Sequence, residues 1–222
     1  MHILILSPYP DNLLAPVLGR GDRVTLRHDH IDTVEIEQLH PDWIISYGYS
    51  RLIEPAALAL CDGRVLNLHI SLLPHNRGAD PNFWSWFDDT AKGVTLHLID
   101  PGMDTGPILA QREIEFDPLA ETLASSYARL RHEIEDLFAQ SWNDIASGRL
   151  LPQPQSARLP VHRVAHKTAL FNGLPAGWQT RACIVKRLSE LPDCERHRPG
   201  MDQSCPCPLG PCELTPDTQT PH

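Results

Sequence analysis

The first 70 residues alternate between short apolar runs and stretches that suit helices. The apolar runs are HILIL at 2–6, DWIISYG at 42–48 and RVLNLHI at 64–70. Nearly continuous apolar runs of this length are typical of strands that are buried on both faces of a parallel sheet. The intervening helical stretches lie at 11–18, 31–41 and 54–63. This alternation predicts an α/β fold with an open, mostly parallel, Rossmann-like sheet and helices on both faces.

Beyond residue 70 the pattern is more varied. It predicts a short helix at 82–90, strands at 93–100 and 108–116, and a long amphipathic helix over 118–147. The apolar stripe of the long helix recurs at helical spacing. That stripe fits either the core or a dimer surface, so a homodimer is left open.

The composition divides the chain into three parts. We expect one catalytic domain over 1–150, followed by a Pro-rich linker and a small C-terminal segment over 151–192, with one helix at 178–190. The Pro- and Cys-rich remainder, 193–222, has no hydrophobic period, and we predict that it is disordered.

Charge and terminal sequence limit the function classes. The formal net charge is −9, which argues against nucleic acid as a partner because phosphate backbones require basic patches. The apolar run at the N-terminus is too short to span a membrane and carries no signal-peptide features. We therefore expect a cytoplasmic protein with no membrane partner and without a disulfide framework.

Four polar side chains fall where strands of such a sheet end. Asn67 and His69 alternate along one strand and so share a face, while Asp100 and Asp104 lie in the loop that follows the 93–100 strand. An Asn amide can donate to an oxyanion, a His can move a proton near neutral pH, and an Asp can orient that His. The chain has no G-x-S-x-G nucleophile elbow. These residue types favour acyl transfer without a covalent enzyme intermediate.

A metal-dependent hydrolase is a different interpretation of the same region. It would use His69, His75, His97 and Asp104 as ligands, but their spacing lacks an H-x-x-x-H pattern. Five of the six cysteines lie at or after residue 183, with spacing unlike that of common zinc ribbons. We therefore expect no metal.

Two longer stretches resemble a known family. LNLHISLLPHNRGADP and GVTLHLIDPGMDTGPILAQ look like the folate-dependent formyltransferases, which include glycinamide ribonucleotide, methionyl-tRNA and sugar-amine N-formyltransferases. The shared pattern is N-x-H, S-L-L-P, R-G, G-V-T and D-x-G, with the Asp 35 residues after the His, as between His69 and Asp104. The part of the chain that carries these motifs is 64–111.

The resemblance implies an activity and a set of site residues. It implies that an amine attacks the formyl carbon of N10-formyltetrahydrofolate directly, with Asn67, His69 and Asp104 as the catalytic residues. Asn67 and His69 would stabilise the oxyanion, and Asp104 would hold His69 and assist proton removal; which of these two first accepts the proton is left open. By similarity the folate is bound largely by main chain, at Arg51, Leu52, Ile53, Leu66, Ile99 and Asp100.

Departures from the family pattern narrow the acceptor. The ribonucleotide enzyme has a Gly-rich phosphate loop after its first strand, whereas this chain has SPYPDN there, which argues against that acceptor. The tRNA enzyme has a basic C-terminal barrel, whereas this chain is acidic, which argues against tRNA. With these two acceptors set aside, the chain is similar to the short sugar-amine formyltransferases. This similarity implies that the acceptor is a nucleotide-linked amino sugar. A hydroxyornithine-like or amino-acid-derived amine is the alternative, and a relative that binds folate or sugar without catalysis is a third. The candidate acceptor-binding residues are His75, Asn76, Arg77, Trp84 and His97, although loop hydrogen bonds or core packing would also account for each of them.

Overall fold

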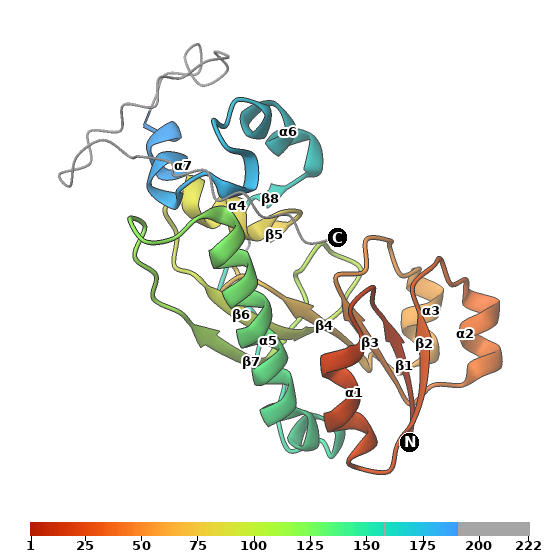
Figure 1. The fold of residues 1–222 in the computed structure, drawn as a ribbon. Coiled ribbons are helices and arrows are strands. Elements are labelled where there is room, and N and C mark those ends of the chain that lie inside the picture. Colours follow the sequence, from red (N-terminus) through yellow and green to blue (C-terminus); the bar gives the residue numbers. More distant parts are fainter. Residues whose placement is uncertain (158, 191–222) are drawn as a thin grey trace, which may run out of the picture.

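A six-stranded mixed sheet forms the centre of the protein (Figure 1). The computed structural model describes residues 1–157 and 159–190. The strand order is β2-β1-β3-β4-β6-β7, with β1 (His2–Leu6), β2 (Arg23–Arg27), β3 (Trp43–Tyr47), β4 (Val65–His69), β6 (Gly93–Leu98) and β7 (Ile108–Glu113). The first four strands pair in parallel, and β6 pairs antiparallel with both β4 and β7. The predicted open, mostly parallel α/β sheet is confirmed.

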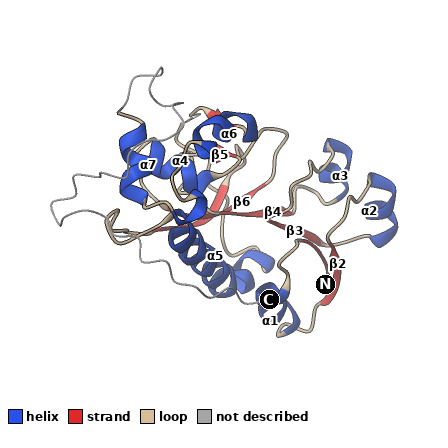
Figure 2. Ribbon diagram, turned by 45° about the horizontal axis from the view of Figure 1, so that its top comes forward, coloured by secondary structure: helices blue, strands red, loops and turns tan. Residues whose placement is uncertain are grey.

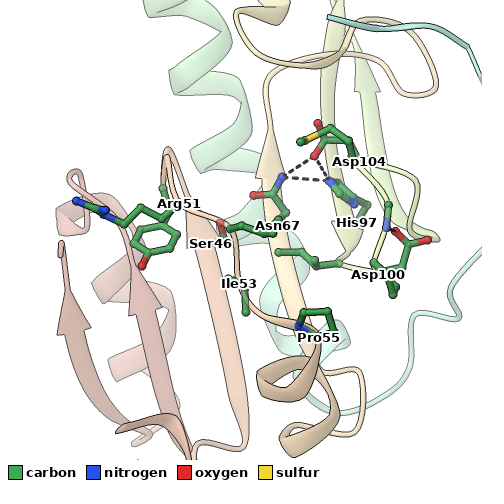
Figure 3. A pocket seen from close by; sticks show the side chains of 14 residues that line it. Ser46, Arg51, Ile53, Pro55, Asn67, His97, Asp100 and Asp104 are labelled. Atoms are coloured by element: carbon green, nitrogen blue, oxygen red, sulfur yellow. Dashed lines mark hydrogen bonds and ion pairs between the residues drawn. The ribbon is translucent and has the colours of Figure 1, made fainter. Parts of the chain in front are cut away.

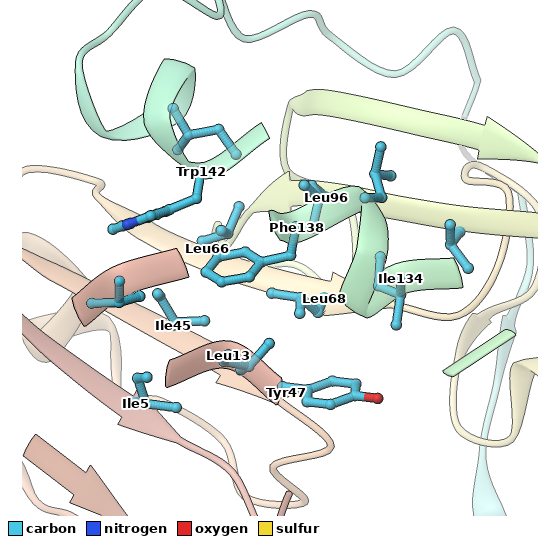
Figure 4. Packing of buried hydrophobic residues seen from close by; sticks show 14 of the residues in the cluster. Ile5, Leu13, Ile45, Tyr47, Leu66, Leu68, Leu96, Ile134, Phe138 and Trp142 are labelled. Carbon is cyan, nitrogen blue, oxygen red and sulfur yellow. The ribbon is translucent and has the colours of Figure 1, made fainter. Parts of the chain in front are cut away.

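Helices cover both faces of this sheet. Helices α1 (Asp11–Leu18) and α5 (Leu123–Ala146) pack on one face, and α2 (Thr33–Leu39) and α3 (Pro55–Leu60) pack on the other. Figure 4 shows the first layer, in which the completely buried Phe138 and Trp142 of α5 meet Leu66 of β4. Burying a side chain of this size contributes roughly 1.5–3 kcal/mol. The long amphipathic helix is therefore a core element.

Strand β4 separates apolar from polar side chains by alternation. Leu66 and Leu68 point into the core under α5. Asn67 and His69 point to the opposite face, at the carboxyl end of the strand. The sheet thus fixes where both polar side chains lie.

Helix α5 begins five residues later than the periodicity predicts. Residues 117–120 form a turn instead, because the Asp117 carboxylate accepts from the Leu119 N–H at 2.9 Å. The helix then starts at a capping box, in which the Thr122 hydroxyl accepts from the Ser125 N–H at 3.0 Å and the Ser125 hydroxyl accepts from the Thr122 N–H at 2.9 Å. Helical spacing alone did not reveal this start.

The C-terminal segment packs on the main sheet domain (Figure 2). It contains β8 (Val161–His162), α6 (Val164–Asn172), a 3₁₀ turn η1 (Gly177–Gln179) and α7 (Ala182–Leu188), and β8 pairs with the short β5 (Arg77–Gly78). Helices α6 and α7 form an apolar cluster with α4 (Pro81–Phe87). The helix predicted at 178–190 corresponds to the shorter α7, but the expectation of one helix in this segment was wrong, because α6 was missed.

Two predictions about organisation stay predictions. One is the division of the chain at residue 150, and the other is the disordered tail, 193–222, which lies outside the described residues. Within 1–157 and 159–190, no helix is both long and apolar enough to cross a membrane.

Candidate active site

Polar side chains from β4, β6 and the loop after β6 converge at the carboxyl end of β4 (Figure 3). Asp104 Oδ2 lies 3.8 Å from His69 Nδ1, and Asp104 Oδ1 lies 3.6 Å from His97 Nε2. Asn67 Nδ2 lies 3.1 Å from His97 Nε2 and donates to Asp104 Oδ1 at 3.5 Å. The structure therefore brings together the three predicted catalytic residues and His97, which are 37 residues apart at most.

The Asp104 loop has a specialised backbone. Asp104 has a φ of +48°, in the left-handed region that L-residues other than Asn and Asp seldom adopt. Gly106 passes so close to the sheet that an added Cβ would lie 1.8 Å from the Leu98 carbonyl oxygen. The Gly78 N–H donates to Asp104 Oδ2 at 2.8 Å. The D-x-G spacing thus places an Asp and a Gly at two positions whose backbone favours these residue types.

The charges of the cluster can be assigned. Burial opposes ionisation of Asp104, but His69 and the Gly78 N–H together hold the pKa of this carboxyl well below its usual range. Burial lowers the pKa of His69, and the nearby Asp104 carboxylate only partly offsets this. At neutral pH the pair consists of a carboxylate and a neutral imidazole.

His97 determines how the Asn67 amide is oriented. His97 Nδ1 lies 2.9 Å from the carbonyl oxygen of Leu98 and donates to it, so in the neutral ring Nε2 is an acceptor. That acceptor faces Asn67 Nδ2. The side chain of His97 is 2% exposed, which leaves it little freedom to turn. His97 positions Asn67, and it also lines the cleft described next.

A cleft opens on one side of the cluster, and we call it the loop cleft. It has an empty volume of about 680 Å³ and is lined by Ser46, Tyr49, Arg51, Leu52, Ile53, Pro55, Asn67, His97, Ile99, Asp100, Pro101, Gly102, Met103 and Asp104. Five of the six predicted folate-binding residues are among them. Leu66 is not, because its side chain is completely buried in the core and its main chain pairs with Ile45 and Leu98 inside the sheet.

A second hollow opens on the other side, and we call it the aromatic pocket. It has an empty volume of about 1570 Å³, and its lining includes Tyr9, Tyr47, His69, Phe83, Tyr127, Arg131, His162, Arg163 and Trp178. The aromatic pocket and the loop cleft share Tyr49, Asn67, Met103 and Asp104. The polar cluster therefore forms the boundary between two hollows.

The other predicted acceptor-binding residues lie mainly in structural roles. Asn76 is buried and bonds to Thr90 and Asp88, at 2.6 and 3.4 Å. Arg77 is buried and donates to the Leu159 carbonyl. Neither residue, nor His75, lines the loop cleft or the aromatic pocket.

Trp84 belongs to the apolar cluster of α4. It is 5% exposed and stacks on the ring of His162, with centroids 4.1 Å apart and planes 8° from parallel. Because His162 lines the aromatic pocket and Trp84 does not, Trp84 supports the pocket wall from behind.

A charged network in the aromatic pocket was not predicted from the sequence. The buried Glu135 accepts from the Tyr47 hydroxyl at 2.7 Å and from the Asn12 amide at 2.6 Å. Arg131, one turn earlier on α5, donates to Tyr47 and Glu135 at 3.2 and 3.3 Å and lies over the Tyr9 ring at 4.1 Å. The spacing of Arg131 and Glu135 on the long helix was the one available signal, and it is equally typical of a surface ion pair.

His162 was missed for a different reason. Its Nε2 lies 2.8 Å from Asp88 Oδ2, and its backbone pairs with Gly78. The sequence around it, between a Pro-rich stretch and α6, shows no motif.

The described residues also bear on the metal interpretation. Within 1–157 and 159–190, no group of three or more His, Cys, Asp and Glu side chains is arranged to hold a metal ion. His69, His97 and Asp104 instead contact one another and Asn67.

Comparisons with known proteins agree on one family. A family model described as formyl transferase matches residues 22–141. The methionyl-tRNA formyltransferase of Pelobacter propionicus is 35% identical over 128 residues, which cover 57% of this chain and 40% of that protein. The corresponding protein of Caldanaerobacter subterraneus subsp. tengcongensis is 33% identical over 157 residues, or 69% of this chain and 49% of that protein. The chain thus spans about half the length of these relatives or less.

Solved structures extend the similarity along most of the chain. The formyltransferase PseJ of Anoxybacillus kamchatkensis, in complex with UDP-4,6-dideoxy-4-formamido-L-AltNAc and tetrahydrofolate, is 39% identical with a TM-score of 0.78. That match covers 84% of this chain and 99% of PseJ. A likely sugar N-formyltransferase of Mycobacterium tuberculosis is 22% identical with a TM-score of 0.70, covering 88% of each chain. At the latter identity the likeness concerns the fold.

Proposed function

Because this chain belongs to the formyl transferase family, we propose that it transfers a formyl group from N10-formyltetrahydrofolate to the amine of a nucleotide-linked amino sugar. One observation carries the proposal: a cluster of Asn, His and Asp lies at the meeting point of two hollows. In this assignment the formyl donor occupies the loop cleft, and the acceptor occupies the aromatic pocket.

The loop cleft suits a pterin bound largely through main chain. The Asp100 carboxylate is already engaged, since Oδ1 accepts from the Thr105 hydroxyl at 2.5 Å and from the Gly102 N–H at 3.0 Å. The apolar side chains of Ile53 and Ile99 face the cleft, and pockets for small organic ligands are mostly apolar with a few polar groups. The tetrahydrofolate bound to PseJ supports the same donor class.

The reaction exchanges one carbon–nitrogen bond for another. The donor supplies the formyl group on N10, and the acceptor amine forms a C–N bond to the formyl carbon as the C–N10 bond breaks. One proton must leave the attacking amine, and one must reach N10. Between these events the formyl oxygen carries a negative charge. The side chains at the boundary have to meet these three requirements.

His69 is suited to move the proton. It is neutral at neutral pH, whereas Asp104, with its lowered pKa, is a weak base. Both ring nitrogens of His69 face acceptors: Nδ1 lies 3.8 Å from Asp104 and Nε2 lies 3.4 Å from the Asn76 carbonyl oxygen. An imidazolium formed by taking the amine proton would therefore have a partner at each N–H, and it could return the proton to N10. Asp104 stabilises the cationic form.

Asn67 is suited to stabilise the oxyanion. His97 fixes its amide by one N–H, and the other N–H contacts Asp104 only at the long distance of 3.5 Å. A donor held in place before the reaction stabilises developing charge without reorganisation. His69, once protonated, would add its positive charge to this stabilisation.

The aromatic pocket supports an acceptor with both a ring and negative charge. Tyr9, Tyr47 and Trp178 provide flat apolar surfaces, and Arg131 and Arg163 provide positive charge in the same hollow. Partial burial of Arg131 opposes its charge, but Tyr47 and Glu135 outweigh this and raise its pKa. Guanidinium groups suit phosphate oxygens. PseJ, which is similar over 99% of its own length, binds a UDP-linked formamido sugar.

An acceptor screen tests the proposal. The purified chain is mixed with N10-formyltetrahydrofolate and, separately, with dTDP-, UDP- and GDP-linked amino sugars, hydroxyornithine and methionyl-tRNA. We expect one nucleotide sugar to gain the mass of one CO while the donor is consumed in equal amount.

The outcomes separate the alternatives. Formylation of methionyl-tRNA or hydroxyornithine in preference to every sugar would replace the acceptor and keep the donor. Absence of folate binding by calorimetry, together with no donor consumption, would contradict the proposal as a whole.

A further inference from the structure

A segment beyond the predicted catalytic domain runs past the Asp104 loop and then past the Gly78 turn. We call residues 153–157 and 159–163 the strap. At its start, Gln153 exchanges two main-chain hydrogen bonds with Ile108, at 2.7 and 2.8 Å. Near its end, β8 pairs in parallel with β5, and the Ala79 N–H donates to the His162 carbonyl at 2.9 Å. The strap thus contacts the chain on both sides of the site.

Between these two contacts, the Gln155 side chain forms hydrogen bonds directly with the Asp104 loop. Its Nε2 donates to the carbonyl oxygen of Asp104 at 2.8 Å and to that of Gly106 at 2.9 Å. Both carbonyls belong to the loop that carries the catalytic carboxylate. Its Oε1 is buried and has no hydrogen-bond partner among the described residues, so these two donated bonds are what hold the amide.

The other end of the strap bears on the carboxylate itself. Gly78, whose N–H donates to Asp104 Oδ2, lies opposite His162 in the β5–β8 pair. Gly78 has a φ of +92°, and an added Cβ would lie 2.1 Å from the His162 carbonyl oxygen. The strap therefore lies against both the main chain and the hydrogen-bond partner of Asp104.

We propose that Gln155 is a positioning residue, which holds the 104–106 loop so that the Asp104 carboxylate stays against His69 and His97. The loop has reason to be held: Asp104 adopts a left-handed conformation, and the loop lies outside any strand or helix. Two carbonyls that share one amide donor fix the loop at two points. This inference rests on the proposed function only where turnover is measured.

The kinetic test compares two glutamines of the strap. Gln155→Ala removes both hydrogen bonds to the Asp104 loop. Gln153→Ala is the matched control, because Gln153 bonds to Ile108 through main chain alone. We expect kcat to fall about tenfold to a hundredfold in the first variant, with little change in either KM, since small displacements of a reacting group are costly. Gln153→Ala should retain the wild-type kcat. Gln155→Met, which keeps the length of the side chain but not the donors, should reproduce the loss and guards against a folding defect.

A double-variant cycle tests whether Gln155 acts through Asp104. In an Asp104→Ala background there is no carboxylate to position, so adding Gln155→Ala should lower kcat by less than about twofold. Losses that multiply would overturn the proposal, because they would mean that Gln155 contributes elsewhere.

A titration that needs no turnover separates this inference from the proposed function. The groups that face His69 are Asp104, His97 and the Asn76 carbonyl. When the loop is released, His69 loses its carboxylate, so the pKa of its ring, followed by NMR and assigned with His69→Asn, should fall further in Gln155→Met and stay unchanged in Gln153→Ala. An unchanged His69 titration in Gln155→Met would overturn the proposal. Absence of formyl transfer by the wild-type protein would contradict the function and leave this measurement valid.

Discussion

The loop cleft and the aromatic pocket meet at the same residues, but the chain builds them in different ways. The loop cleft is lined by residues from 46–55, Asn67 and 97–104, all between β3 and the loop after β6. The aromatic pocket draws on residues as far apart as Tyr9 and Trp178. A site made from one compact stretch can be recognised by its spacing, whereas one assembled from distant segments cannot. This difference explains why the donor class follows from motifs and the acceptor does not.

Loss of a boundary residue should abolish use of both hollows at once. We expect Asn67→Ala, His69→Asn and Asp104→Ala each to lower kcat by at least about a hundredfold, because each removes an oxyanion donor or an acid–base group. Steady-state turnover at saturating donor and acceptor measures this, with His75→Ala as the control, since His75 lines neither hollow. Near-normal turnover in any of the three would remove that residue from the mechanism.

Removal of the guanidinium from the aromatic pocket should affect the acceptor alone. Arg131→Met should raise the acceptor KM about tenfold to a hundredfold, the range expected for losing a charge-assisted hydrogen bond of about 1.5–3 kcal/mol. The donor KM should stay within twofold.

Arg129→Ala is the matched control for this prediction. Arg129 lies on the same helix but packs over Phe116, outside the pocket. A rise in the donor KM in Arg131→Met would mean that the two hollows are not separate binding sites.

The pH dependence of kcat/KM should reflect the titration of His69, which lies between the two hollows. His69 must be neutral to accept a proton, and burial lowers its pKa, so the acid limb of kcat/KM should lie below the ordinary histidine value of about 6.5. Activity should change little between pH 7 and pH 8. Two acceptors with different amine pKa values distinguish this limb from one that belongs to the substrate, because only the latter moves. An acid limb above the ordinary value would contradict the assignment of His69 as the base.

The smallest effect should come from the rim of the loop cleft. Leu52 is 75% exposed and lines this cleft with its side chain, while the proposed grip on the folate is largely main chain. Leu52→Ala should therefore raise the donor KM only a few-fold, the effect of losing a small apolar contact, and leave the acceptor KM unchanged. Leu18→Ala, an equally simple change of an exposed leucine on α1, serves as the reference. A rise of the donor KM by more than about a hundredfold in Leu52→Ala would show that side chains, rather than main chain, contribute most to folate binding.

The residues that could be predicted from the sequence, and those that could not, divide in the same way. Asn67, His69 and Asp104 were predicted to act together from strand alternation and a fixed spacing, which are properties of one stretch of the chain, and the structure places the three side chains next to one another. Gln155 and Arg131 were not found, because their roles depend on which distant segment lies against them. Helix α6 was missed for a related reason. Its apolar side chains pack against α4, and the spacing of apolar residues within α6 does not reveal that contact.

The antiparallel pairing of β6 with its neighbours β4 and β7 also could not be predicted from the sequence pattern. Apolar alternation in β6 and β7 predicted strands correctly, but it carries no information on direction. Direction depends on the connection, and here the short turn between the two strands contains Asp104. The loop that carries Asp104 is thus the one that reverses the chain.

The pairing of β5 with β8 sets a condition for anyone who would re-engineer this protein. Exchanging the C-terminal segment for that of a relative is an obvious route to a new acceptor, because His162, Arg163 and Trp178 lie in it. The same segment carries the strand that pairs with Gly78 and the amide that bonds the Asp104 loop. A chimera joined after residue 163 keeps these contacts, whereas one joined at residue 150 replaces them together with the pocket wall. The place of the junction therefore decides whether this segment can be exchanged without losing its contacts to Gly78 and to the Asp104 loop.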